Sequence, residues 1–174
     1  MESAERIDVV RDSSQWTAVH EAIVRRAALA ALDADSVSVQ ATLCVLLSDD
    51  AAIRILNQQF RGIDRPTNVL SFPASKTRGQ VSLGDIAIAF ETVAREAETE
   101  CKIFGDHLAH LTVHGVLHLL GDDHETAAQA EAMEAREVMI LAGLGIADPY
   151  RDTELVPDIA SSYRSSTLTN PVPL

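Results

Sequence analysis

Three histidines in the segment 114–124, HGVLHLLGDDH, have a spacing that suits a metal ion. On a helix, His114 and His118 stand four residues apart, so both imidazoles project from one face about one turn apart. Gly121 can adopt a left-handed conformation that ends this helix and lets His124 return to the pair. Three neutral imidazoles with an open fourth position are typical of catalytic zinc, whose bound water has a pKa lowered to ~7. The alternative is a set of core or helix-cap histidines, but two partnerless imidazoles on an apolar helix would cost desolvation.

The same histidine spacing occurs in metalloproteases with the pattern HExxHxxGxxH. In those enzymes the glutamate after the first histidine deprotonates the zinc-bound water. Position 115 of this chain is glycine, so peptide hydrolysis would need a base from another segment. A zinc peptidase with a non-standard base stays open as an alternative. Three imidazoles favour one Zn²⁺ ion, although nickel and copper also bind such a set.

The charge of the chain is unevenly distributed. With 174 residues, 14 Lys and Arg and 26 Asp and Glu, the net charge is −12. This balance argues against nonspecific coating of nucleic acid, which depends on many cationic contacts to phosphate. Between positions 51 and 82, however, Asp64 is the only acid. The basic residues of this stretch, which we call the basic segment, are Arg54, Arg61, Arg65, Lys76 and Arg78.

The order of the expected strands and helices predicts an α+β fold. Apolar periodicity predicts a small mixed sheet of about four strands, over 7–10, 37–47, 68–72 and 83–90. It also predicts about five helices, over 16–32, 49–61, 91–102, 106–120 and 125–143. The helix 106–120 is apolar almost all round, so we expect it to be central and buried, with two of the metal-ligand histidines on it. Two successive strands with no helix between them argue against a regular doubly wound sheet.

The length of the chain suits one domain. We expect residues 1–148 to form it, and the stretch 149–174, rich in Ser, Thr and Pro, to be a mobile tail. The apolar stretches are far shorter than the ~18–20 residues of a bilayer span, and acids near the N-terminus do not fit a secretory signal. We therefore expect a cytoplasmic protein in which Cys44 and Cys101 are reduced, buried thiols.

Four sequence blocks together resemble the YbeY-type bacterial endoribonucleases that mature ribosomal RNA. The blocks are HGVLHLLGDDH at 114–124, RPTNVLSFP at 65–73, LGDIAIA at 83–89 and NQQFRG at 57–62, in the family's order and approximate spacing. The resemblance implies a metal-dependent hydrolase of single-stranded RNA that matures the 3′ end of small-subunit rRNA and acts in ribosome quality control. As partners it implies the rRNA precursor, small ribosomal subunit proteins and an assembly GTPase. We expect the protein to bind neither DNA nor a membrane.

The resemblance also implies roles for individual residues. The family's metal ligands correspond to His114, His118 and His124, and its functional arginine corresponds to Arg61. A planar guanidinium can hold two phosphate oxygens and stabilise charge that develops at phosphorus. The alternative for Arg61 is a solvated side chain at a helix C-terminus. Where family members commonly have aspartate, this chain has Asn68, which cannot act as a base.

The absence of that aspartate directs attention to Asp85, which lies just inside an expected strand. As a buried acid it could accept a hydrogen bond from a ligand imidazole or from substrate water, and the alternative is a turn residue at the strand edge. Arg61 and Asp85 are therefore the candidate catalytic residues. The candidate substrate-binding residues are Arg61, Arg65, Ser71, Lys76 and Arg78, and the basic segment is expected to guide the RNA strand. We expect His107 and His110 to be packed or supporting histidines rather than ligands.

A third hypothesis is a non-catalytic assembly factor that docks on the small ribosomal subunit. A structural zinc ion can contribute ~10–16 kcal/mol to the folding of small peptides, so the histidine site could serve the fold alone. This hypothesis predicts that His114→Ala unfolds the protein while Arg61→Ala leaves RNA processing intact. A catalytic site predicts that Arg61→Ala folds normally but loses processing.

Overall fold

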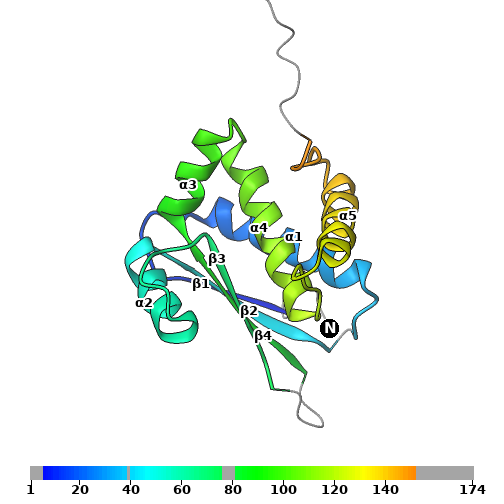
Figure 1. Ribbon diagram of the computed structural model, residues 1–174, viewed down its shortest axis with the longest axis horizontal. Coiled ribbons are helices and arrows are strands. Elements are labelled where there is room, and N and C mark those ends of the chain that lie inside the picture. The colour runs from blue at the N-terminus through cyan, green and yellow to red at the C-terminus, as the bar shows by residue number, and fades with distance from the viewer. Residues whose placement is uncertain (1–5, 39, 76–80, 152–174) are drawn as a thin grey trace, which may run out of the picture.

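A computed structural model of the protein describes residues 6–38, 40–75 and 81–151. The elements in chain order are β1 (Ile7–Arg11), α1 (Ala18–Ala34), β2 (Thr42–Ser48), α2 (Asp50–Arg61), β3 (Val69–Pro73), β4 (Ser82–Ala89), α3 (Phe90–Thr99), α4 (Phe104–Leu119) and α5 (Ala127–Gly143). The strands form one sheet in the order β1-β2-β4-β3, and β3 is antiparallel to β4 while the other pairs are parallel. The predicted α+β class, a small mixed sheet with helices around it, is confirmed (Figure 1).

The two faces of the sheet pack against different helices, because side chains alternate along a strand. Ile86 and Ile88 of β4 belong to the main core, which α1 and α4 share. Ala87 and Ala89 point the other way and pack with Ile53 of α2. Helix α4 lies between α1, α3 and α5 (Figure 1), and eleven of its sixteen residues are buried. The prediction of a central helix that carries the histidines is therefore confirmed.

Helix α4 approaches the sheet closely at Gly115. A Cβ atom at this position would lie 3.1 Å from Cδ1 of Ile86 and 3.3 Å from Oγ of Ser71. The Ser71 hydroxyl donates a hydrogen bond of 3.1 Å to the carbonyl oxygen of Gly115. Thus the glycine that stands where metalloproteases have a glutamate is a packing residue, and it brings the histidine-bearing helix against β3.

Some local predictions need correction. The strand predicted over 37–47 begins at Thr42. The helix predicted to end at 102 ends at Thr99, because Cys101 adopts a left-handed conformation with a φ of 53° and turns the chain toward α4. Cys101 is exposed and Cys44 is half-buried, so the prediction of two buried thiols is wrong, although both are free. Burial, with a smaller contribution from nearby carboxylates, raises the pKa of the Cys44 thiol.

The chain continues to pack after α5. It turns at Gly145, which has a φ of 78°, and Tyr150 then comes back over α4 with its ring centroid 5.3 Å from that of His110. Tyr150 thus contacts the core helices two residues past the predicted domain boundary at 148, and that boundary stays a prediction. The rest of the predicted tail, 152–174, lies outside the described residues. Across the described ranges, no helix combines the length and the apolar character that crossing a bilayer would require.

Candidate functional site

The three predicted ligands converge at the C-terminal end of α4. His114 and His118 lie about one turn apart, with their Nε2 atoms 3.0 Å from each other. Helix α4 ends at Leu119, and Gly121, with a φ of 103°, reverses the chain. The ring of His124 then returns to centroid distances of 5.7 Å from His114 and 4.9 Å from His118. One candidate ligand atom of each histidine lies within 4.8 Å of those of the other two.

This donor set fits a tetrahedral zinc ion. Two nitrogen ligands at ~2.0–2.1 Å from zinc are about 3.3 Å apart, close to the 3.0 Å between the Nε2 atoms of His114 and His118. Burial, and then the neighbouring His114 and His124, lower the pKa of His118. A lowered pKa favours the neutral imidazole, which is the form that binds metal. Within the described residues, no other group of His, Cys, Asp or Glu side chains converges in this way.

Each of the two helical histidines uses its Nδ1 atom for a contact with the protein. Nδ1 of His118 lies 2.9 Å from the carbonyl oxygen of Asp122, and Nδ1 of His114 lies 2.5 Å from Oε1 of Glu137. Carbonyl and carboxylate oxygens only accept, so these nitrogens carry the ring protons. The lone pairs on Nε2 therefore face the point where the three rings meet, as metal binding requires.

Glu137 of α5 is a site residue that the sequence analysis missed. Its side chain is fully buried, with 0% of its surface exposed. Burial alone would raise its pKa, but hydrogen bonds from His110, His114 and Tyr150 outweigh burial and lower the pKa to about 2. The sequence does contain a signal for this residue, because a carboxylate interrupts the buried apolar stripe of α5. The buried residues of that helix are Met133, Glu137, Ile140 and Leu141.

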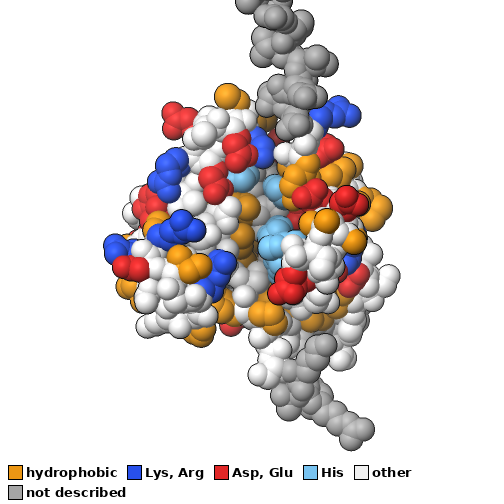
Figure 2. Space-filling model, viewed as in Figure 1, with side chains coloured by type: hydrophobic (Ala, Val, Ile, Leu, Met, Phe, Trp, Pro, Cys, Tyr) orange, Lys and Arg blue, Asp and Glu red, His pale blue; other side chains and the backbone are white. Residues whose placement is uncertain are grey.

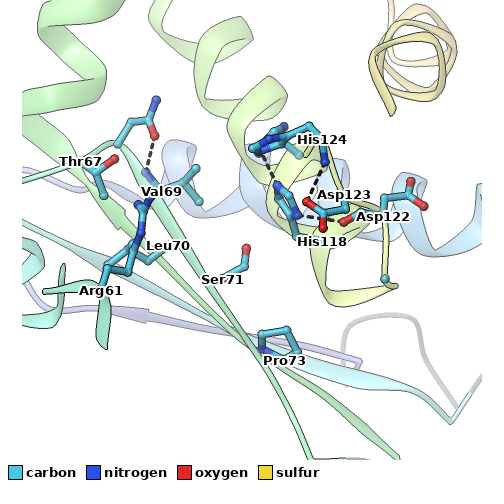
Figure 3. A pocket seen from close by; sticks show the side chains of 13 residues that line it. Arg61, Thr67, Val69, Leu70, Ser71, Pro73, His118, Asp122, Asp123 and His124 are labelled. Carbon is cyan, nitrogen blue, oxygen red and sulfur yellow. Dashed lines mark hydrogen bonds between the residues drawn. The ribbon is translucent and has the colours of Figure 1, made fainter. Parts of the chain in front are cut away.

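The histidines form one wall of an open cleft of about 570 Å³. Its other wall is the end of α2 with Arg61, and its floor is β3 with the residues just before it. In the close view, Arg61 lies across Ser71 from His118 and His124 (Figure 3). On the molecular surface, histidine side chains lie in a hollow, with Lys and Arg on the flank over α2 and Asp and Glu on the opposite flank (Figure 2). The cleft thus joins a candidate metal site to a cationic wall.

Arg61 is placed by the way in which α2 ends. It is the last residue of the helix, and Gly62, with a φ of 71°, caps the helix through hydrogen bonds from its N–H to two carbonyl oxygens of the last turn. The loop that follows is tied back by Asn57, whose Nδ2 donates a bond of 2.7 Å to the carbonyl oxygen of Arg65. The local backbone is therefore fixed, while the Arg61 side chain is exposed.

Arg61 and Arg54 lie on the same helix but have different environments. Arg54 forms an ion pair of 2.7 Å with Asp64 on the outer surface. The Arg61 side chain makes no hydrogen bond or ion pair with any of the described residues. Its guanidinium group is thus available to an anion in the cleft.

The remaining predicted substrate-binding residues fall into three groups. Ser71 lines the floor of the cleft, but its hydroxyl proton is used by the Gly115 carbonyl. Arg65 lines a smaller pocket of about 340 Å³ that adjoins the cleft, because Arg61 lines both. Lys76 and Arg78 lie outside the described residues.

The prediction that Asp85 is a buried acid beside the metal site is wrong. Asp85 is exposed, and it does not line the cleft. It pairs in register with Cys44 and Phe72, next to Ile86 on β4. Ile86 faces α4 at Gly115, so the alternation of side chains places Asp85 on the opposite face of the sheet.

Asn68 belongs to a polar link between the cleft and the core. Its Nδ2 lies 3.1 Å from both carboxylate oxygens of Glu96, and its Oδ1 accepts a bond of 2.7 Å from the N–H of Val69. Glu96 in turn lies 2.8 Å from Nε2 of the buried His107. An aspartate at position 68 would bring a second carboxylate against Glu96, so the amide suits this neighbourhood.

An α+β protein with three convergent histidines on and after its central helix has the donor set of a catalytic metal centre. The chain belongs to the endoribonuclease YbeY family, whose model matches residues 7–145. That range contains every element from β1 to α5 and all three histidines.

Individual relatives agree with this assignment. An endoribonuclease YbeY of a Bradyrhizobium species is 55% identical over 142 residues, covering 77% of this chain and 84% of the relative. One from Rhodopseudomonas palustris is 52% identical over 162 residues, covering 88% of this chain and 95% of the relative. The solution structure of a Thermotoga maritima protein matches with a TM-score of 0.53 and 24% identity, covering 83% of this chain and 99% of that one, and shows the same fold.

Proposed function

We propose that this chain is a metal-dependent endoribonuclease that cleaves single-stranded RNA in the cytoplasm, in the maturation of the 3′ end of small-subunit rRNA and in ribosome quality control. The observation that carries the proposal is the position of Arg61, whose side chain has no partner in the described part of the chain, across a cleft from three convergent imidazoles. The name of the family to which the chain belongs supports the choice of RNA. In this proposal the partners are the rRNA precursor, small-subunit proteins and an assembly GTPase.

The chemistry divides between the two walls of the cleft. His114, His118 and His124 would hold one divalent ion, for which zinc is the best match to three imidazoles. When bound, the ion supplies positive charge that polarises a phosphodiester oxygen and acidifies water. From the opposite wall, the guanidinium of Arg61 donates two parallel hydrogen bonds to phosphate oxygens and stabilises the negative charge that grows there during hydrolysis.

The charge distribution of the protein determines how strongly its affinity for RNA depends on salt. Net charge is strongly negative, and the described cations around the cleft without a protein partner are Arg61 and Arg65. A single strand whose affinity rests on two phosphate contacts should lose affinity with salt at a slope of about −1.4 in a log-log plot, at ~0.7 per phosphate. The described part of the cleft therefore offers the RNA few cationic contacts, all near the reacting phosphate.

The test compares Arg61→Ala with Arg54→Ala in zinc-loaded protein, using a labelled single-stranded RNA. We expect Arg61→Ala to keep its fold and its zinc but to cleave about 10²–10³-fold more slowly, since it removes a donor to the developing charge. Arg54→Ala removes a cation from the same helix outside the cleft, so it should cleave at the rate of the unaltered protein. Equal rates for both variants would overturn the proposed role of Arg61.

Two further experiments separate the nuclease from the peptidase and from the assembly factor. Zinc-loaded protein that cleaves an unstructured polypeptide but not RNA would favour a peptidase, although a side chain in place of Gly115 would crowd Ile86 and Ser71. Normal rRNA processing in cells that carry Arg61→Ala would favour an assembly factor with a structural metal. We expect cleavage of RNA alone and failed processing with Arg61→Ala.

A further inference from the structure

A buried carboxylate lies directly behind the metal site. Glu137 extends from α5 to the histidine face of α4 and has 0% of its side chain exposed. Among the described residues it is the acid that the core encloses completely. Enclosing a carboxylate costs free energy unless hydrogen bonds compensate it, so its presence among Met133, Ile140 and Leu141 needs a physical reason.

The two oxygens of Glu137 have separate partners. Oε1 lies 2.5 Å from Nδ1 of His114. Oε2 lies 3.0 Å from Nε2 of His110 and also accepts a hydrogen bond from the Tyr150 hydroxyl. The buried Nδ1 of His110 has no hydrogen-bond partner. This arrangement suits a neutral His110 whose one ring proton is on Nε2 and is donated to the carboxylate.

We propose that Glu137 is a positioning residue for the metal site: it holds the proton of His114 on Nδ1 and fixes the ring so that Nε2 faces His118 and His124. Tyr150 and His110 hold Glu137 in turn. The inference rests on the proposed metal site but not on the identity of the substrate.

The geometry favours this role over a purely structural one. A carboxylate that served only to join α4 and α5 could contact any polar group between them, yet one oxygen of Glu137 is given entirely to a metal ligand. The other helical ligand, His118, is fixed by a backbone carbonyl of the turn that follows α4. The exposed His124 comes from that same turn. Glu137 therefore supplies to His114 the support that the local chain supplies to His118.

Tyr150 extends the site to the segment after α5. The chain turns at Gly145, and the side chain of Asp148 accepts a hydrogen bond of 2.9 Å from the N–H of Tyr150. This turn directs the Tyr150 hydroxyl inward to Glu137, although 40% of the tyrosine remains exposed. A residue beyond the last helix thus contributes to the position of a ligand on the central one.

The first experiment measures zinc affinity by competition with a chromogenic chelator, without RNA. Glu137→Gln should bind zinc about 10–100-fold more weakly than the unaltered protein, as is usual when the partner of a ligand histidine is lost. Glu134→Gln, one turn earlier on α5 and exposed, is the matched control and should bind normally. Tyr150→Phe removes one hydrogen bond to Glu137, and a loss of about 2–10-fold is expected. Equal affinity for Glu137→Gln and Glu134→Gln would overturn the proposal.

A second measurement needs no variant to fold. The ¹⁵N chemical shifts of the His114 ring in the zinc-free, unaltered protein should show the proton on Nδ1, where Glu137 accepts it. A proton on Nε2 would overturn the proposal even if Glu137→Gln proved insoluble. At saturating zinc, Glu137→Gln should regain most of its RNA cleavage, whereas Arg61→Ala should not. Because affinity and ring shifts are read without RNA, failure of this inference is distinct from failure of the proposed nuclease activity.

Discussion

The two walls of the cleft are built in opposite ways. The histidine wall stands on α4, the most buried helix, and the rings of His114 and His118 are each held through Nδ1 by another protein group. The arginine wall stands on the exposed end of α2, and the side chain of Arg61 has no partner among the described residues. Contacts with other protein groups hold the rings of one wall, and the other wall presents an exposed charge without such contacts among the described residues.

This difference has a functional consequence. A metal ligand must be held within a few tenths of an ångström, because metal–nitrogen distances are short and fixed, so rigid support raises affinity. A cation that must stay in contact with an RNA phosphate as the strand shifts can do so better when its side chain is flexible and its backbone is fixed. Substitutions in the histidine wall should therefore change metal content and cleavage together, while substitutions in the arginine wall should change cleavage alone.

The largest effect is expected for His118→Ala. Loss of this ligand leaves His114 and His124, which cannot form a three-nitrogen site, so cleavage should fall by about 10³-fold or more. Zinc content, measured by elemental analysis of the purified variant, should fall in parallel, and far-UV circular dichroism should show that the helices remain. A variant that lacks zinc but cleaves RNA at the usual rate would contradict the role given to the histidine wall.

A smaller effect is expected for Arg61→Lys. Lysine keeps the charge but loses the planar fork that binds two phosphate oxygens, so cleavage should fall by about 10–100-fold. Zinc content should stay unchanged, which is the contrast with His118→Ala. Cleavage rates at saturating RNA are the measurement. If the lysine variant matched the unaltered protein, charge alone would account for this wall, and a bidentate contact would be excluded.

Local spacing was sufficient to predict the histidine wall. Helical periodicity and Gly121 define where three nearby residues go, because only one turn of helix and one reversal of the chain separate them. The strand and helix pattern likewise predicted the mixed sheet and the central helix. By contrast, the face on which Asp85 points depends on the register of β4 against its neighbours, and a shift by one residue reverses it.

Contacts between distant segments could not be predicted in this way. Glu137 meets His114 across 23 positions of sequence, and Tyr150 reaches His110 across 40. No local pattern fixes how α5 packs on α4, so the carboxylate inside an apolar stripe was the only available sign. The exposed position of Cys101 depends on a left-handed backbone between two helices, which residue type does not indicate for cysteine.

The next prediction concerns Gly115, which joins the histidine wall to the floor of the cleft. Gly115→Ala places a methyl group 3.1 Å from Ile86 and 3.3 Å from the Ser71 hydroxyl, so it should destabilise the protein by about 1–3 kcal/mol. The matched control is Gly143→Ala near the end of α5, where nothing lies within 4 Å. That change should leave stability equal or raise it by up to about 1 kcal/mol. Urea unfolding of both variants is the measurement, and a Gly115 variant as stable as its control would show that α4 can move away from β3.

The smallest effect is expected for Asn68→Asp, at the edge of the arginine wall. Burial by itself would raise the pKa of Glu96, but the hydrogen bonds from His107 and Asn68 lower this pKa by more than burial raises it. The pKa of Glu96 therefore lies below its ordinary value, and Glu96 is ionised at neutral pH. The substitution replaces an N–H donor by a second carboxylate, which should cost about 1 kcal/mol and lower the melting temperature by about 2–4 °C at pH 7.

Acid should reduce this difference between Asn68→Asp and the unaltered protein. In the unaltered protein, the stability that comes from the lowered pKa of Glu96 is present at neutral pH and is lost as the pH falls through that pKa. In the variant, protonation of one carboxyl removes the repulsion at the same time. Melting temperatures followed from about pH 7 to pH 4 should therefore converge. Equal melting temperatures at pH 7 would mean that the two carboxylates already share a proton there, which would contradict an ionised Glu96 beside the cleft.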